Sequence, residues 1–146
     1  MAIQTGQSVE ASDFVFETCR VYQTSGVSLS GGVAIPFQAE HFDTDSMHDN
    51  STNNTRITFN TAGFYAIGGS LYLSTTDAGR VGIRLNGSTD LASNYFTTSS
   101  GLAAGSVTTF HEFQIGDYIE LVGTSNGTSS GDTRTNFWAV KIGFGS

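Results

Sequence analysis

One stretch, residues 55–73, constrains the fold more than any other part of the chain. Its sequence, TRITFNTAGFYAIGGSLYL, contains two apolar runs rich in β-branched and aromatic residues, separated by a short polar turn. In the first run, Ile57 and Phe59 alternate with polar neighbours, which is the period of a half-buried β-strand. Gly63 suits the turn because glycine adopts a positive φ without steric cost. We therefore predict two strands here, near the centre of a β-sandwich.

Gly68 and Gly69 lie inside the second apolar run. Glycines within a strand typically mark a bulge, or a place where another part of the protein approaches the backbone closely. The sequence therefore predicts that this strand is interrupted at the two glycines and is completed by Leu71, Tyr72 and Leu73.

The composition favours an all-β domain with many turns. The 146 residues include 18 Gly, 11 Phe and 1 Pro, and only 13% are charged. Strand-forming β-branched and aromatic residues are common, and no helical periodicity persists long enough to predict a helix. A chain of this length suits one domain with its own hydrophobic core.

Turn signals recur between apolar runs at the spacing of a sandwich, which predicts roughly eight to ten strands. The Asn-Gly pair at 86–87 is the strongest of these signals and predicts a tight hairpin. Residues 94–106 and 123–132 are rich in Ser, Thr and Gly, so we predict that they form long loops. The apolar density of residues 136–144 predicts a central strand that is buried on both faces.

Charge and motif content exclude several classes of function. The net charge is −7 and the chain has six Lys and Arg residues, too few for a phosphate-binding stripe, so we expect no nucleic-acid partner. No apolar run reaches the roughly 20 residues of a membrane helix, so we expect no membrane partner. Cys19 is the only cysteine and is interpreted as a small buried hydrophobe. Since no catalytic or phosphate-binding motif is present, we expect no enzyme activity, no catalytic residues and no cofactor.

Residues 41–54, HFDTDSMHDNSTNN, form the most polar stretch and are predicted to be a loop. Asp43, Asp45 and Asp49 are candidate metal ligands, because oxygen-rich loops can hold calcium. Their spacing fits no standard calcium loop. The alternative is that these side chains form Asx turns at a corner of the sandwich.

The order of motifs along the chain resembles the jelly-roll superfamily of complement-type globular heads and tumour necrosis factor. The matching segments are FDT at 42–44, RITF at 56–59, TAGFY at 61–65, IRLNG at 83–87, GDYIEL at 116–121 and FWAV at 137–140. The resemblance implies a jelly-roll β-sandwich of about ten antiparallel strands that forms a homotrimer. Aromatic side chains are the candidates for the trimer interface: Tyr65, Tyr72, Tyr118, Phe137 and Trp138. The alternative is that all five lie in the core of one subunit.

Two segments resemble bacteriophage proteins in particular. Residues 42–69 resemble the versions of this domain encoded by tailed phages, and residues 5–14 resemble the attachment segment that begins many phage virion proteins. The resemblance implies an N-terminal attachment arm at residues 1–16 and a jelly-roll head domain at residues 17–146. The apolar side chains of the arm are the candidates for binding the capsid: Ile3, Val9, Phe14 and Phe16.

Two functions follow from this resemblance. The first is a structural virion protein on the outer capsid surface, a trimeric decoration (cement) protein that binds the major capsid protein and stabilises the shell. The alternative is the receptor-binding head of a tail or head fibre that recognises a host-surface glycan. In that case the two predicted loops would supply the ligand contacts, with Tyr95, Phe96 and Asn126 as the candidates.

Overall fold

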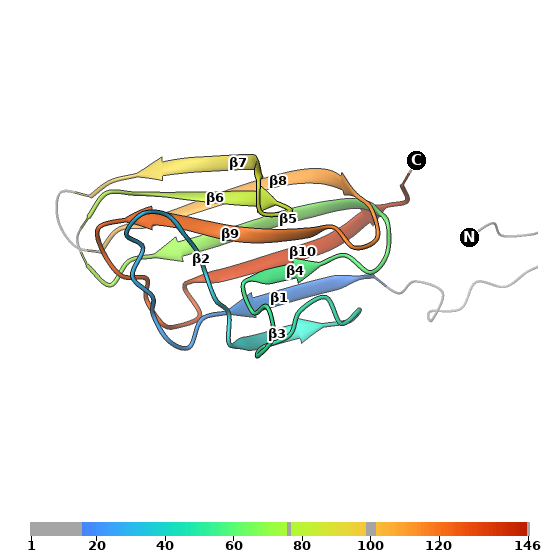
Figure 1. Cartoon of the computed structure of the whole chain (residues 1–146), viewed down its shortest axis with the longest axis horizontal. Helices are drawn as coiled ribbons and strands as arrows, with labels where there is room; N and C mark the ends of the chain where they lie inside the picture. Colours follow the sequence, from blue (N-terminus) through green and yellow to red (C-terminus); the bar gives the residue numbers. More distant parts are fainter. Residues whose placement is uncertain (1–15, 76, 99–101, 146) are drawn as a thin grey trace, which may run out of the picture.

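The computed structural model describes residues 16–75, 77–98 and 102–145. These residues form ten β-strands in two antiparallel sheets of five strands each, which pack face to face as a sandwich (Figure 1). The predicted all-β sandwich of about ten strands is therefore confirmed. The described part of the chain contains no helix long and apolar enough to cross a membrane.

The first sheet, called sheet A here, has the strand order β3-β1-β10-β5-β8. Its strands are β1 (Thr18–Tyr22), β3 (Ala39–Asp43), β5 (Gly63–Tyr72), β8 (Ala104–Phe113) and β10 (Asn136–Gly143). The second sheet, sheet B, has the order β2-β9-β6-β7, with β4 also paired to β9. Its strands are β2 (Val33–Ala34), β4 (Arg56–Thr58), β6 (Gly79–Leu85), β7 (Thr89–Phe96) and β9 (Tyr118–Ser125).

An aromatic cluster lies at the centre of the core between the two sheets. The ring of Phe59 stacks on that of Phe113 with 3.8 Å between their centroids, and Tyr65 meets Phe59 edge-on at 4.6 Å. Every second residue of a strand faces this core, because side chains alternate across a sheet. Cys19 follows this rule and is fully buried, as the sequence predicted. Burial and the nearby carboxylates raise the pKa of its thiol.

The two glycines of β5 do not interrupt the strand. β5 pairs with β8 in unbroken register from Gly63 to Tyr72, so the predicted interruption is wrong. The structure instead shows the alternative, in which other parts of the protein approach the backbone of this strand closely. A Cβ at Gly68 would lie 2.5 Å from Cζ2 of Trp138, and a Cβ at Gly69 would lie 2.7 Å from Cδ1 of Leu121. Glycine is required here because side chains pack directly onto both faces of the strand.

The turn between β6 and β7 has the predicted chemistry, since Asn86 and Gly87 both have positive φ, 50° and 73°. The first predicted long loop is shorter than expected, and the second is displaced to residues 126–135. β7 continues to Phe96 and β9 continues to Ser125, because each pairs with the first residue of β6, Gly79. Cross-strand pairing therefore imposes an extended conformation on residues whose composition indicated a loop.

Candidate interaction surfaces

The outer face of sheet A carries a set of apolar side chains that point away from the core. They alternate with the buried residues of three adjacent strands and form what we call the apolar face: Phe64, Ala66, Phe110, Trp138, Val140 and Ile142. Pairing places several of them side by side, with Phe110 opposite Ala66 and Ala66 opposite Val140. The exposed fraction is 74% for Phe110, 60% for Ile142 and 41% for Phe64.

This exposure corrects one prediction and indicates a role. β10 is central in sheet A, as predicted, but it is not buried on both faces, since Trp138 and Val140 are half-buried and Ile142 is exposed. Large contiguous apolar patches are uncommon on monomers and mark surfaces that contact another molecule. The apolar face is therefore a candidate interaction surface.

Two of the five predicted trimer-interface residues lie in the core instead. Tyr65 and Phe137 are fully buried within one chain, so neither can contact a partner, and these two predictions are wrong. The hydroxyl of Tyr65 donates a hydrogen bond of 2.8 Å to the carbonyl oxygen of Thr61, and burial raises the pKa of that hydroxyl. The ring of Phe137 stacks on Phe37 with 5.9 Å between centroids. Strand alternation turns both side chains inward, which aromatic character alone does not reveal.

The other three candidates lie on opposite faces of the sandwich. Tyr72 and Trp138 belong to strands of sheet A and alternate with its buried residues, so they lie on its outer face. Tyr118 lies on the outer face of sheet B, where the guanidinium carbon of Arg56 sits 3.9 Å from the centre of its ring. One flat contact surface cannot include both faces. The apolar face therefore includes Trp138 and excludes Tyr118.

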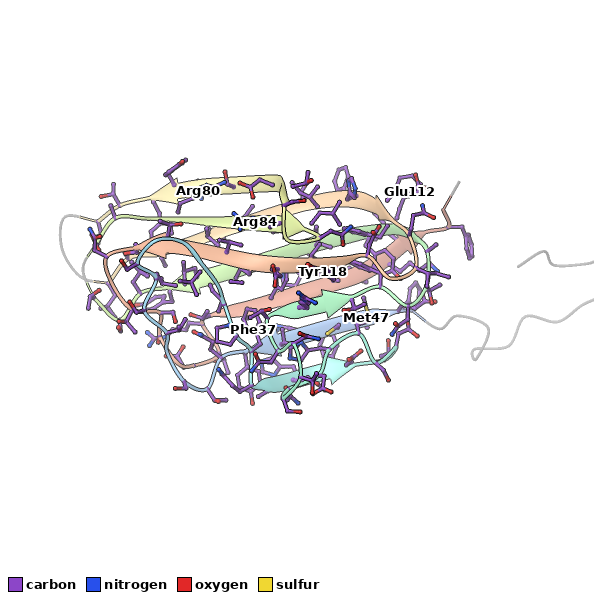
Figure 2. All side chains as sticks on the ribbon, viewed as in Figure 1. Phe37, Met47, Arg80, Arg84, Glu112 and Tyr118 are labelled. Carbon is purple, nitrogen blue, oxygen red and sulfur yellow. The ribbon has the colours of Figure 1, made fainter. Side chains whose placement is uncertain are left out.

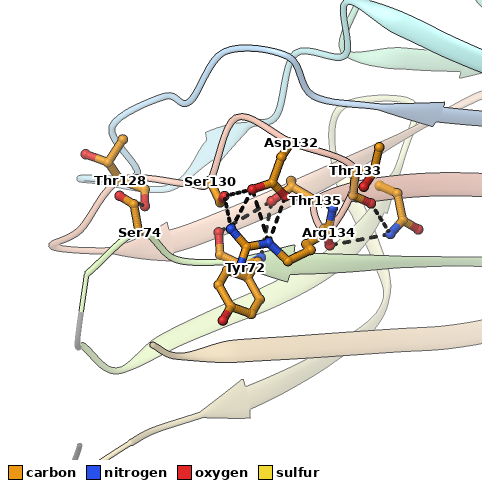
Figure 3. Close-up of polar contacts among 9 residues, drawn as sticks. Tyr72, Ser74, Thr128, Ser130, Asp132, Thr133, Arg134 and Thr135 are labelled. Atoms are coloured by element: carbon orange, nitrogen blue, oxygen red, sulfur yellow. Dashed lines mark hydrogen bonds and ion pairs between the residues drawn. The ribbon is translucent and has the colours of Figure 1, made fainter. Parts of the chain in front are cut away.

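Tyr72 is already covered on one side within the chain (Figure 3). The guanidinium carbon of Arg134 lies 4.0 Å from the centre of the Tyr72 ring. Asp132 holds this guanidinium, since Nη2 of Arg134 donates to its Oδ2 at 2.6 Å and Nε donates to its Oδ1 at 3.0 Å. These bonds, together with that from the Ser130 hydroxyl, keep the pKa of Asp132 well below its usual range. Tyr72 therefore has less aromatic surface available for contact with a partner than the sequence analysis predicted.

Two of the three candidate metal ligands bind the backbone of their own loop, whereas Asp45 accepts a hydrogen bond of 3.2 Å from the hydroxyl of Thr61. Asp43 accepts hydrogen bonds from the backbone N–H groups of Asp45, Met47 and His48, at 3.2, 2.9 and 2.9 Å. Asp49 accepts from the N–H groups of the second and third residues after it, which lowers its pKa to about 2. The Asx-turn alternative is therefore confirmed for these two residues. Among the described residues, no group of three or more His, Cys, Asp or Glu side chains is placed to hold a metal ion.

The three predicted ligand contacts lie together. Tyr95, Phe96 and Asn126 all line one groove of about 550 Å³, at the end of sheet B where β7 and β9 finish and β6 begins (Figure 1). Asp77 and Arg80 line the same groove, and sequence reasoning missed them. The signal that could have identified them is the hairpin at 86–87. The register of this hairpin places the start of β6, near which Asp77 and Arg80 lie, beside the end of β7, where Tyr95 lies.

The predicted capsid-binding arm falls largely outside the described residues, which exclude Ile3, Val9 and Phe14. Phe16 is described and is 62% exposed. Its carbonyl oxygen accepts a hydrogen bond of 2.8 Å from the hydroxyl of Thr44. It lies two residues before β1, which begins at the end of the sandwich opposite the groove, where β10 also ends (Figure 1).

Comparison with known proteins identifies the fold. The chain matches no model of a protein family and no curated protein sequence. Among solved structures, murine APRIL at pH 5.0 is similar over 88% of this chain and 100% of its own, with a TM-score of 0.72 and 11% identity. Eiger TNF from S. frugiperda is similar over 90% of this chain and 95% of its own, with a TM-score of 0.65 and 12% identity. The chain thus has the jelly-roll fold of tumour necrosis factor-like domains, as the order of motifs predicted.

Proposed function

We propose that this chain forms a homotrimer through the apolar face of sheet A, and that the trimer is a capsid decoration protein of a bacteriophage virion. The observation that carries the first part is the exposure of the apolar face, above all of Phe110 at 74%. Removing such surface from water is the dominant favourable contribution to association. The threefold state is supported by the fold, since tumour necrosis factor-like domains are trimers.

The layout of the apolar face suits a closed ring. A threefold ring needs two unlike patches on each subunit, one meeting the other on the next subunit. Phe110 lies on β8, an edge strand of sheet A, whereas Trp138 and Val140 lie on the more central β10. In the proposed ring, the β8 edge of one subunit packs against the β10 region of its neighbour.

The virion role is supported by the phage-like segments of the sequence and by where the chain enters the head. Phe16, the last residue of the predicted arm, lies exposed at one end of the sandwich. An arm joined at that end can reach across capsid subunits while the head stands above them. Binding that occurs only when the shell is assembled stabilises the shell by mass action.

Two measurements test this proposal. Light scattering and sedimentation of the full chain should give the mass of three 15.4 kDa subunits. A monomer mass at every concentration would refute the trimer. Quantitative mass spectrometry of purified virus particles should then give a copy number comparable to that of the major capsid protein. A handful of copies per particle would refute the decoration role and favour a fibre head.

The second candidate, a receptor-binding fibre head, is favoured by one specific observation. Its three proposed ligand contacts come from two places in the chain, Tyr95 and Phe96 from the end of β7 and Asn126 from the residue after β9, yet they line a single groove. Adsorption of the purified protein to host cells tests this candidate. Absence of adsorption, together with a high copy number, would leave decoration as the function.

A further inference from the structure

We infer that the groove at the end of sheet B binds a neutral saccharide through stacking on Tyr95 and hydrogen bonds to Asp77 and Asn126. The inference rests on the second candidate function proposed above and names the class of ligand that its groove binds. It commits to one class of ligand, a short oligosaccharide made of uncharged sugar units.

Three paired strands bring the groove residues into rows. Arg80 of β6 pairs with Tyr95 of β7 on one side and with Thr124 of β9 on the other. These three side chains share the outer face of sheet B, and Arg80 lies nearer to the groove end of β6 than Arg84 does (Figure 2). The preceding row consists of Gly79 and its two pairing partners, Phe96 and Ser125. The side chains of these two partners face inward. The sheet therefore fixes both the outer row and the floor of the groove.

The floor of the groove is held firmly in place. The ring of Phe96 packs against the backbone of two glycines, Gly79 and Gly105, and a Cβ at Gly79 would lie 2.6 Å from its Cζ. Phe96 also packs against the hydrophobic core. A groove with a fixed floor needs little reorganisation when a ligand binds, which favours affinity.

Tyr95 supplies an aromatic platform above this floor. Its side chain is 77% exposed, and the guanidinium carbon of Arg80 lies 5.9 Å from the centre of its ring. Exposed aromatic rings offer a large, rigid contact area with a polar hydroxyl at the tip. A pyranose ring has one face made of C–H groups, and this face is complementary to such a platform.

Polar groups beside the platform match the hydroxyl groups of a sugar. Asp77 accepts one hydrogen bond from N–H of Ala78 at 2.8 Å and one from the hydroxyl of Ser125 at 3.1 Å. These two bonds fix the carboxylate, and because a carboxylate offers about four acceptor sites, it can accept more. Asn126 lies exposed at the same groove and offers both an amide donor and an amide acceptor. Sugar hydroxyls donate and accept, so both side chains can engage them.

The charges of the groove favour a neutral ligand over an anionic one. The cation of Arg80 is already paired, since its Nη2 donates to Oδ2 of Asp90 at 2.7 Å. Asp77 leaves a negative charge at the groove, and the whole chain has a net charge of −7. Sialic acid and other anionic sugars would therefore meet repulsion. The volume of about 550 Å³ lies within the range of about 300–1,000 Å³ typical of small-molecule sites.

The experiment uses the full chain and two variants that alter the proposed contacts. The protein is applied to an array that carries neutral and sialylated glycans, and the neutral glycan with the strongest signal is then titrated by NMR. We expect amide shifts at Ala78, Thr97 and Asn126. We expect Tyr95→Ala and Asp77→Asn to weaken binding at least tenfold, equivalent to about 1.4 kcal/mol.

Ile115→Ala is the matched control, because Ile115 is 72% exposed, close to the 77% of Tyr95, but does not line the groove. Its binding should be unchanged. A silent array, binding to sialylated glycans alone, amide shifts elsewhere on the molecule, or full affinity in Tyr95→Ala would each overturn the inference. The thermal midpoint and subunit mass of every variant are measured as well. Failure of the saccharide site with an intact trimer is therefore distinct from failure of the proposed assembly.

Discussion

The substitution Phe110→Asp should dissociate the proposed trimer without unfolding its subunits. A phenylalanine side chain has a surface of about 200 Å², and Phe110 exposes 74% of its surface in the single chain. About 150 Å² is therefore available for burial in a contact, which at about 25 cal/mol per Å² contributes up to ~4 kcal/mol per subunit. Aspartate removes this contribution and adds the cost of burying a carboxylate. Because Phe110 is exposed in the subunit, its replacement should change subunit stability by only about 0.5 kcal/mol.

Sedimentation velocity over a wide range of concentration measures this effect directly. The wild-type chain should sediment as a trimer, and Phe110→Asp as a monomer under the same conditions. Trp138 gives an independent signal, since it is the only tryptophan and lies half-buried on the apolar face. Assembly should shift its fluorescence to shorter wavelength in the wild type but not in the variant.

Ile115→Asp serves as the control for this experiment. Ile115 is 72% exposed, so it has nearly the exposure of Phe110, but it lies in the turn between β8 and β9. The reasoning would be refuted if Phe110→Asp kept the mass and the fluorescence of the wild type. It would equally be refuted if Ile115→Asp dissociated the assembly to the same extent, since the effect would then come from added charge and not from the apolar face.

Three further predictions concern the single subunit. Phe113→Ala removes a ring whose centroid lies 3.8 Å from that of Phe59 in the core. It should lower the free energy of unfolding, measured by denaturant titration, by about 3–5 kcal/mol. A loss below about 1 kcal/mol would contradict the stacking of these two rings. Cys19 is fully buried with a raised thiol pKa, so it should react with a thiol reagent only after unfolding, and rapid labelling of the native protein would argue against its position. Asp49 should titrate in NMR with a pKa of about 2, below its ordinary value of 3.8. The stability that its ionised carboxylate gives to the folded loop is therefore complete above pH 4 and is lost as the pH falls through about 2. A measured pKa near 3.8 would contradict its backbone hydrogen bonds.

The local pattern of the sequence predicted most strands because strand formation depends on neighbouring residues. Alternation at Ile57 and Phe59 placed β4 correctly, and the Asn-Gly pair placed the hairpin between β6 and β7. The ends of strands were less predictable. Residues up to Phe96 and Ser125 are extended because they pair with β6, and no local composition encodes that pairing.

The candidate sites were predictable only in part, for a related reason. Aromatic residues in strands suggested contacts, but a one-residue difference in position decides whether a ring enters the core or leaves it. Phe137 is buried and its neighbour Trp138 lies on the outer face. Tyr95 and Asn126 were predicted as candidate ligand contacts, whereas Asp77 lines the same groove only because β6 begins where β7 and β9 end.

Local sequence patterns were sufficient to predict the class of the fold, the approximate strands and the tightest turn, since periodicity and turn chemistry act over a few residues. Tertiary structure alone decided which side chains share a surface. Phe110 and Val140 lie 30 positions apart in the sequence, yet both flank Ala66 on the apolar face. Such neighbours depend on the order and register of the strands, which arise from packing two whole sheets together.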